Sequence, residues 1–67
     1  MKSIDIFWFD ENGPIWIEVV DTVEIAKARI EELRKSEKLP QVKSGSYAVI
    51  DRRTGQTLYR SSKQLSI

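Results

Sequence analysis

Residues 4–20 read IDIFWFDENGPIWIEVV, and this stretch decides the fold. Two runs rich in β-branched and aromatic residues, about 4–9 and 15–20, flank the polar sequence DENGP. Runs of this composition favour strands, and Asn-Gly is a pair that tolerates the positive φ angles of a type I′ turn. The stretch therefore predicts a β-hairpin with Asn12 and Gly13 at the centre of its turn.

Strand alternation divides this hairpin into two faces, and both are apolar. With Phe9 opposite Trp16, the expected core face consists of Ile4, Ile6, Trp8, Ile15, Ile17 and Val19. The second face consists of Phe7, Phe9, Trp16 and Val20, with Asp5 and Glu18 as its polar members. A solvated antiparallel sheet normally presents polar side chains there. We therefore expect an interaction surface on the second face, or on the Trp8 face if the helix covers the second one.

The segment over about 22–38 predicts an amphipathic helix. Asp21 is the expected N-cap with Glu24 at the capping-box position, and Val20 and Ile25 are spaced for a hydrophobic staple. The apolar positions recur at helical spacing in one stripe: Val23, Ala26, Ile30 and Leu33. A single stripe predicts a helix that packs one side against a sheet.

Residues 47–51 and 56–60 predict a second pair of strands, joined by the turn DRRTG. In that turn Asp51 can accept backbone hydrogen bonds, and Gly55 can adopt a left-handed conformation. If Asp51 faces Gln56, the core face of this hairpin holds Tyr47, Val49 and Leu58, and the outer face holds Ala48, Ile50, Thr57 and Tyr59. An error of one residue in register would exchange the faces of a strand.

These elements predict one small α+β domain over residues 1–67, a four-stranded antiparallel sheet in ββαββ order with one helix packed on one face. A right-handed crossover between the hairpins favours the strand order 2-1-3-4. The tail over 61–67 is expected to be loose.

The composition removes most catalytic chemistry. The chain has no Cys and no His, so thiolate nucleophiles, Cys/His zinc sites and the usual general base are excluded. Acidic neighbours such as Glu31 and Glu32 point apart on a helix and do not form an acid/base pair. We expect no enzyme activity, no cofactor and no metal. No apolar run approaches the length of a membrane span, and the absence of cysteine favours a cytoplasmic location.

The charge is unevenly distributed. Residues 1–33 carry a net charge of −5 and residues 34–67 carry +6. This asymmetry indicates either two halves that complement each other or a surface for an acidic partner or nucleic acid. The candidate nucleic-acid residues are Arg52, Arg53, Arg60 and Lys63, with Tyr59 between them as a stacking residue.

Two resemblances accompany these patterns. The segments TVEIAKARIEEL and SYAVIDRRTGQTLYR resemble a group of short bacterial proteins of unknown function, over most of residues 15–59. That resemblance implies the ββαββ architecture and no activity. Residues 13–33 are more weakly similar to HicB-type antitoxin domains, although we expect a hairpin after the helix and no appended DNA-binding tail, which departs from that pattern.

The leading functional expectation is a non-enzymatic protein-interaction module that forms a homodimer or binds a protein partner. Its candidate interface residues are Phe7, Phe9, Trp16, Ile50 and Tyr59. Apolar patches of this kind mark interfaces because soluble monomers rarely expose them. The alternatives are a nucleic-acid-binding domain that uses the basic second hairpin, and an antitoxin-like regulator.

Overall fold

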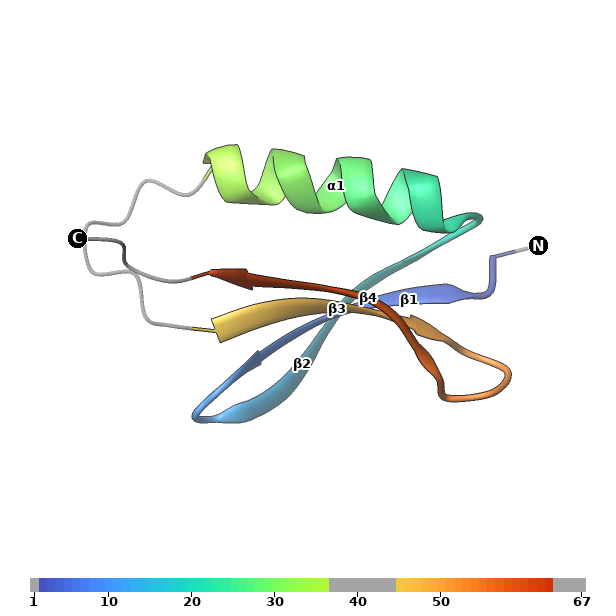
Figure 1. Cartoon of the computed structure of the whole chain (residues 1–67), viewed down its shortest axis with the longest axis horizontal. Coiled ribbons are helices and arrows are strands. Elements are labelled where there is room, and N and C mark those ends of the chain that lie inside the picture. Colours follow the sequence, from blue (N-terminus) through green and yellow to red (C-terminus); the bar gives the residue numbers. More distant parts are fainter. Residues whose placement is uncertain (1, 37–44, 64–67) are drawn as a thin grey trace.

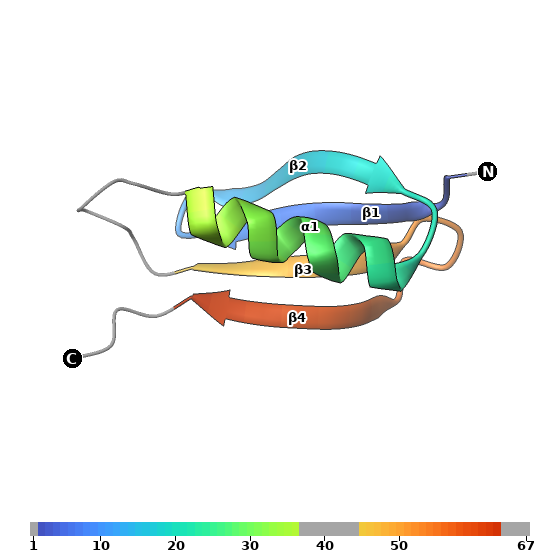
Figure 2. The same cartoon turned by 90° about the horizontal axis from the view of Figure 1, so that it is seen from above.

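A computed structural model describes residues 2–36 and 45–63 of the chain. Its elements are, in chain order, β1 (Ile4–Asp10), β2 (Gly13–Val20), α1 (Val23–Ser36), β3 (Gly45–Asp51) and β4 (Thr57–Lys63). All neighbouring strands are antiparallel and their order is β2-β1-β3-β4, with α1 lying across one face (Figure 1, Figure 2). The predicted α+β fold and strand order are confirmed. No helix of the described residues has the length and apolarity needed to cross a membrane.

The core lies between the sheet and α1. Its buried members come from three strands and the helix: Ile4, Ile6, Val20, Tyr47, Val49, Ala26 and Ile30. Val23 and Leu33 pack against this cluster from the two ends of α1, so the predicted helical stripe is the buried one. Trp8 also packs against the cluster, with its ring 4.9 Å from the ring of Tyr47 in an edge-on arrangement. The helix therefore covers the face on which Ile4, Ile6 and Trp8 were expected.

The helix begins one residue later than the predicted cap implies. The Thr22 hydroxyl accepts a hydrogen bond from the Ile25 N–H at 3.1 Å, and the Thr22 carbonyl accepts the Ala26 N–H. Thr22, and not Asp21, is therefore the N-cap. Ile25 points to solvent while Val20 is buried in the core, so the predicted staple is not formed. The helix is observed to Ser36, and residues 37 and 38 of the predicted span lie outside the described residues.

The first hairpin turns around Glu11 and Asn12, which corrects the predicted turn. Asp10 pairs with Gly13, and of the two turn residues expected to have positive φ only Gly13 does, at 102°. The Asp10 carboxylate accepts the Asn12 N–H at 2.8 Å, and this local bond stabilises the turn one residue earlier. As a result Trp16 lies opposite Phe7 and not Phe9, although all three residues keep their predicted face.

A β-bulge at Ile17 exchanges the faces of the last residues of β2. Beyond the bulge Ile6 pairs with Glu18 and Ile4 with Val20, so both Glu18 and Val20 lie on the helix side and Val19 on the other. The predicted positions of these three residues were wrong. An extra residue in one strand changes the alternation of every residue after it. The exchange places Glu18 beside Arg29 of α1, with 2.8 Å between the carboxylate oxygen and Nε.

A second bulge, at Leu58, has the same effect on β4. The turn itself is as predicted, because Asp51 N–H bonds the Gln56 carbonyl and Gly55 has a positive φ of 77°. The bulge then pairs Val49 with Tyr59, so Tyr59 lies on the helix side. Leu58, expected in the core, is exposed.

The strand β4 extends to Lys63, so the part of the tail over 61–63 is ordered strand and not loose chain. Ser61 is buried, and its hydroxyl accepts a hydrogen bond from Arg34 of α1 at 2.9 Å. This bond ties the end of the second hairpin to the helix. The remainder of the predicted loose tail, 64–67, lies outside the described residues.

Gly45 begins β3 against the Trp8 ring. A Cβ at this position would overlap the Trp8 side chain and lie 2.8 Å from the Phe9 carbonyl oxygen. We expect Gly45→Ala to lower the free energy of unfolding by about 1–2 kcal/mol, because the Trp8 ring and the backbone at Phe9 must shift to make room for the methyl group. Urea denaturation followed by circular dichroism measures this loss.

The matched background for Gly45→Ala is Trp8→Leu, which removes the ring that the new methyl group meets. In that background the Gly45→Ala loss should shrink, because the ring overlap is removed and the close approach to the Phe9 carbonyl oxygen remains. An equal loss in both backgrounds would show that the Trp8 ring is not what restricts position 45.

Candidate functional site

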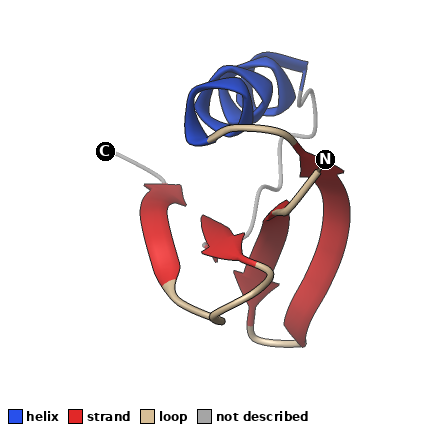
Figure 3. Ribbon diagram, turned by 90° about the vertical axis from the view of Figure 1, so that its right-hand side faces the viewer, coloured by secondary structure: helices blue, strands red, loops and turns tan. Residues whose placement is uncertain are grey.

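The sheet face opposite α1, which we call the open face, is not covered by any described element (Figure 3). Strand pairing places on it residues from all four strands: Asp5, Phe7, Phe9, Trp16, Val19, Ser46, Ala48, Ile50 and Arg60. Most of these side chains are apolar. A large apolar surface on a small domain is typical of an interaction site.

The aromatic side chains occupy the two strands at one edge of the sheet. Phe7 and Phe9 of β1 are half-buried with ring centroids 6.0 Å apart, and Trp16 of the edge strand β2 is 52% exposed. Ala48 is buried on this face although no described element lies over it. Its neighbours on the adjacent strands are Phe7 and Arg60, which have longer side chains. The open face is therefore a packed aromatic layer.

Asp5 is the buried polar residue at one end of this layer. It is 7% exposed, and one oxygen accepts the Trp16 indole N–H at 3.0 Å and Arg52 Nη2 at 2.8 Å. The other oxygen accepts Arg52 Nε at 3.2 Å. The bidentate contact with Arg52 and the hydrogen bond from Trp16 join β1, β2 and the turn of the second hairpin in one network. It also orients the indole of Trp16, since the N–H has a defined partner.

The pKa of Asp5 reflects these contacts. Burial by itself raises the pKa of the carboxyl group, but the hydrogen bonds from Arg52 and Trp16 and the guanidinium charge outweigh burial and hold the pKa below its ordinary value. Asp5 is therefore an anion at neutral pH with both oxygens occupied by donors. Such a carboxylate holds structure together and is not placed to take a proton from a substrate.

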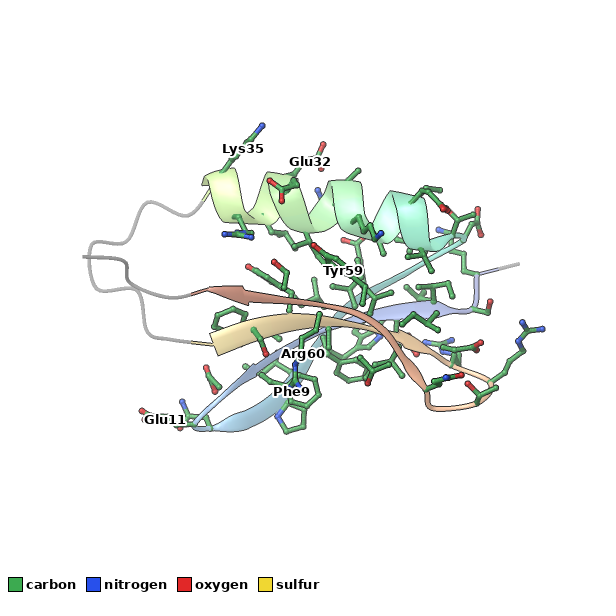
Figure 4. All side chains as sticks on the ribbon, in the orientation of Figure 1. Phe9, Glu11, Glu32, Lys35, Tyr59 and Arg60 are labelled. Atoms are coloured by element: carbon green, nitrogen blue, oxygen red, sulfur yellow. The ribbon has the colours of Figure 1, made fainter. Side chains whose placement is uncertain are left out.

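Arg60 lies over the other end of the aromatic layer. Its guanidinium carbon is 5.7 Å from the centroid of Phe9, within the range of a cation–π contact. Figure 4 shows Arg60 and Phe9 together on the side away from α1, whereas Tyr59 lies between sheet and helix. Within the described residues Arg60 has no carboxylate partner, and its Nε donates a long hydrogen bond of 3.4 Å to the Ser46 hydroxyl.

Four of the five predicted interface residues, Phe7, Phe9, Trp16 and Ile50, share the open face. The fifth, Tyr59, packs against the core cluster and has Lys27 of α1 over its ring at 4.9 Å. The outer position predicted for Tyr59 was therefore wrong.

The predicted basic residues do not form one cluster. Arg52 donates its backbone N–H to Ser3 at the start of β1, whereas Arg60 lies over Phe9 near its end. Arg52 is paired with Asp5, and Arg53 is 3.8 Å from the Asp51 carboxylate. Lys63 is the last residue of β4. The ion pair between Arg52 and Asp5 joins the basic and acidic halves within a single chain.

Sequence reasoning missed the role of Asp5 as a buried centre. The available signal was one acidic residue on a strand otherwise made of large apolar residues, at the end where the second hairpin turns. In the described residues, no group of three or more His, Cys, Asp or Glu side chains is arranged to hold a metal ion.

Comparison with known proteins does not assign the chain to a family. No family model matches the chain, and no curated protein or solved structure matches it significantly. The resemblances to short bacterial ββαββ proteins and to HicB-type antitoxins therefore stay predictions.

Proposed function

We propose that this chain is a non-enzymatic protein-interaction module that binds another protein chain through the open face. The observation that supports it is the packed aromatic layer of Phe7, Phe9 and Trp16, which the described elements leave uncovered. Burial of such a layer in a complex contributes about 25 cal/mol per Å² of apolar surface, before the costs of association. A cytoplasmic location belongs to the same proposal as a prediction, and the bound chain is either a second copy, which gives a homodimer, or a different protein.

The aromatic layer and its polar partners also contain the residue types that contribute most of the binding energy in protein interfaces. Tryptophan and arginine are frequent among such hot-spot residues, and here Trp16 and Arg52 both donate hydrogen bonds to the buried Asp5. A side chain that is already oriented loses less conformational entropy on binding. Because the network orients Trp16 and Arg52 in the free protein, we expect a partner to bind without rearrangement of these two side chains.

Site-specific photocrosslinking in the organism that encodes the chain tests the proposal. Benzoylphenylalanine in place of Phe9 keeps an aromatic ring on the open face. The control is the same group in place of Ile25, which is 48% exposed on α1. We expect discrete crosslinked protein species from position 9 and none of them from position 25.

Mass spectrometry of the crosslinked species then distinguishes a second copy of the chain from a different protein. No crosslinked protein from position 9, or the same species from both positions, would contradict the proposal. Thermal melts of both labelled proteins must match the unlabelled chain within a few degrees, so that a failure reports on binding and not on folding.

The nucleic-acid alternative has less support. Of its three arginines with described side chains, Arg60 alone has no carboxylate contact within the described residues. Nonspecific nucleic-acid affinity grows with the number of phosphates that basic side chains neutralise. The antitoxin alternative stays a prediction from resemblance.

A further inference from the structure

Among the described residues, the exposed charges of the open face are all cationic. The carboxylate described on this face, Asp5, is buried and has both oxygens bonded by Arg52 and Trp16. The arginines at its two ends remain accessible, since the Arg52 side chain is 52% exposed and Arg60 is exposed. Glu18, the other acidic residue expected on this face, lies on the helix side and bonds Arg29. An approaching partner therefore meets aromatic surface between the exposed part of the Arg52 guanidinium, whose charge Asp5 partly neutralises, and Arg60, which has no carboxylate contact within the described residues.

The two arginines are a defined distance apart along β1. Arg52 bonds Asp5, and Arg60 lies over Phe9, which is four residues further along the same strand. At the rise of an extended strand this separation is about 13 Å. An extended peptide that lies along β1 would bring side chains four residues apart to these two guanidinium groups, with its intervening residues over Phe7 and Trp16.

The same charges disfavour a second copy of the chain as the occupant. A twofold dimer buries the same patch on both subunits, so Arg52 and Arg60 would meet an equally cationic surface. The described residues of this face in the partner copy would bring no unbonded carboxylate, because Asp5 is already satisfied. Like charges placed together across an interface are costly.

A nucleic acid is also a poorer match than a protein. Two guanidinium groups neutralise few phosphates, whereas single-stranded nucleic acids bind along grooves with many cations. The guanidinium group of Arg60 also lies over the Phe9 ring, on which a base would stack.

We propose that the open face binds an acidic segment of a protein partner in extended conformation, with two carboxylates about four residues apart and a large apolar side chain between them. This inference rests on the proposed function and names the chemistry of its partner. Arg52 and Arg60 receive the carboxylates, and the apolar side chain contacts Trp16 and Phe7.

A random dodecapeptide library displayed on phage, selected on the intact chain, tests this inference. We expect the enriched sequences to carry two acidic residues with Leu, Phe or Trp between them. For synthetic versions of these peptides, fluorescence anisotropy should show an affinity loss of about fivefold or more with Arg60→Glu, because an ion pair becomes a repulsion. Peptides with Lys at the corresponding acidic position should bind Arg60→Glu better than the original chain.

The matched control is Arg53→Glu, which makes the same charge change at a side chain of the second turn that is 78% exposed. It should leave peptide affinity within about twofold, because exposed charges beyond the contact are screened by salt. Enriched peptides without acidic residues, no enriched peptides, or equal losses with both variants would overturn the inference. So would tighter binding of a mixed-sequence DNA or RNA oligomer than of the peptides.

The photocrosslinking experiment separates this inference from the proposed function. A crosslink from position 9 to a second copy, or to a basic segment of another protein, overturns the acidic partner but leaves the open face as a protein-binding surface. No crosslinked protein at all overturns both.

Discussion

Ile30→Ala should leave a large fraction of the chain unfolded at 25 °C. Ile30 is 1% exposed, in the middle of α1, and belongs to the core cluster that joins the helix to the sheet. Truncation of a buried isoleucine costs about 2–5 kcal/mol, and a domain of this size has only about 3–5 kcal/mol of stability from its core. Urea denaturation followed by far-ultraviolet circular dichroism should show the midpoint move to low urea or disappear.

Ile25→Ala is the matched control, because it removes the same atoms from the same helix. Ile25 is on the exposed side of α1, and alanine is the better helix former, so the free energy of unfolding should change by no more than about 0.5 kcal/mol. If the two variants lost equal stability, α1 would not pack on the sheet through the stripe that contains Ile30.

The contrast between these two isoleucines could be predicted from the sequence alone, because helical periodicity is a local property. The stripe of Val23, Ala26, Ile30 and Leu33 is the buried one. The same holds for the turn of the second hairpin, where Asp51 and Gly55 act as their side chains dictate. In these two elements the geometry depends on a few neighbouring residues, and the prediction was correct.

The two bulges could not be predicted in this way. A bulge has no strong residue signature, and it is favoured here by what it brings together across the molecule: Glu18 with Arg29, and Tyr59 with Lys27. Because those partners lie in another element, the sequence of the strand itself does not show the bulge. A prediction from strand alternation therefore assigned the residues after Ile17 and Leu58 to the wrong faces. The N-cap prediction was also wrong. Asp21 and Thr22 are both residue types that cap helices well, and the helix uses Thr22.

The residues of the candidate site divide in the same way, into those whose face follows from strand alternation and those that a bulge moves to the other face. Phe7, Phe9, Trp16 and Ile50 precede or adjoin the bulges without crossing them, and they are on the open face as predicted. Tyr59 follows a bulge and is not. The network around Asp5 needed the three-dimensional structure, because Asp5 and Arg52 are 47 residues apart in the chain.

Asp5→Asn should be the most damaging single change on the open face. The amide keeps the shape of the carboxyl group, but its NH₂ group cannot accept the hydrogen bonds that Arg52 donates. Hydrogen bonds to a charged group contribute about 1.5–3 kcal/mol each, and one partly exposed arginine recovers part of that loss from water, so we expect a loss of about 2 kcal/mol. Chemical denaturation at neutral pH measures it, with Glu32→Gln on exposed α1 as a control that should change stability by less than about 0.5 kcal/mol.

The pH dependence of stability shows whether the charge of Asp5 is the cause. Because the pKa of Asp5 is lowered in the folded protein, the unfolded chain binds a proton more readily than the folded one between the two pKa values. The stabilising contribution is therefore complete above the ordinary carboxyl pKa of about 4, and it decreases as the pH falls toward the lower folded value. Asp5→Asn should remove this part of the acid destabilisation, so the difference between variant and original chain should narrow as the pH falls below about 4. A difference that stayed constant across that range would mean that Asp5 acts through its shape and neutral hydrogen bonds, and that its ion pair with Arg52 contributes no stability.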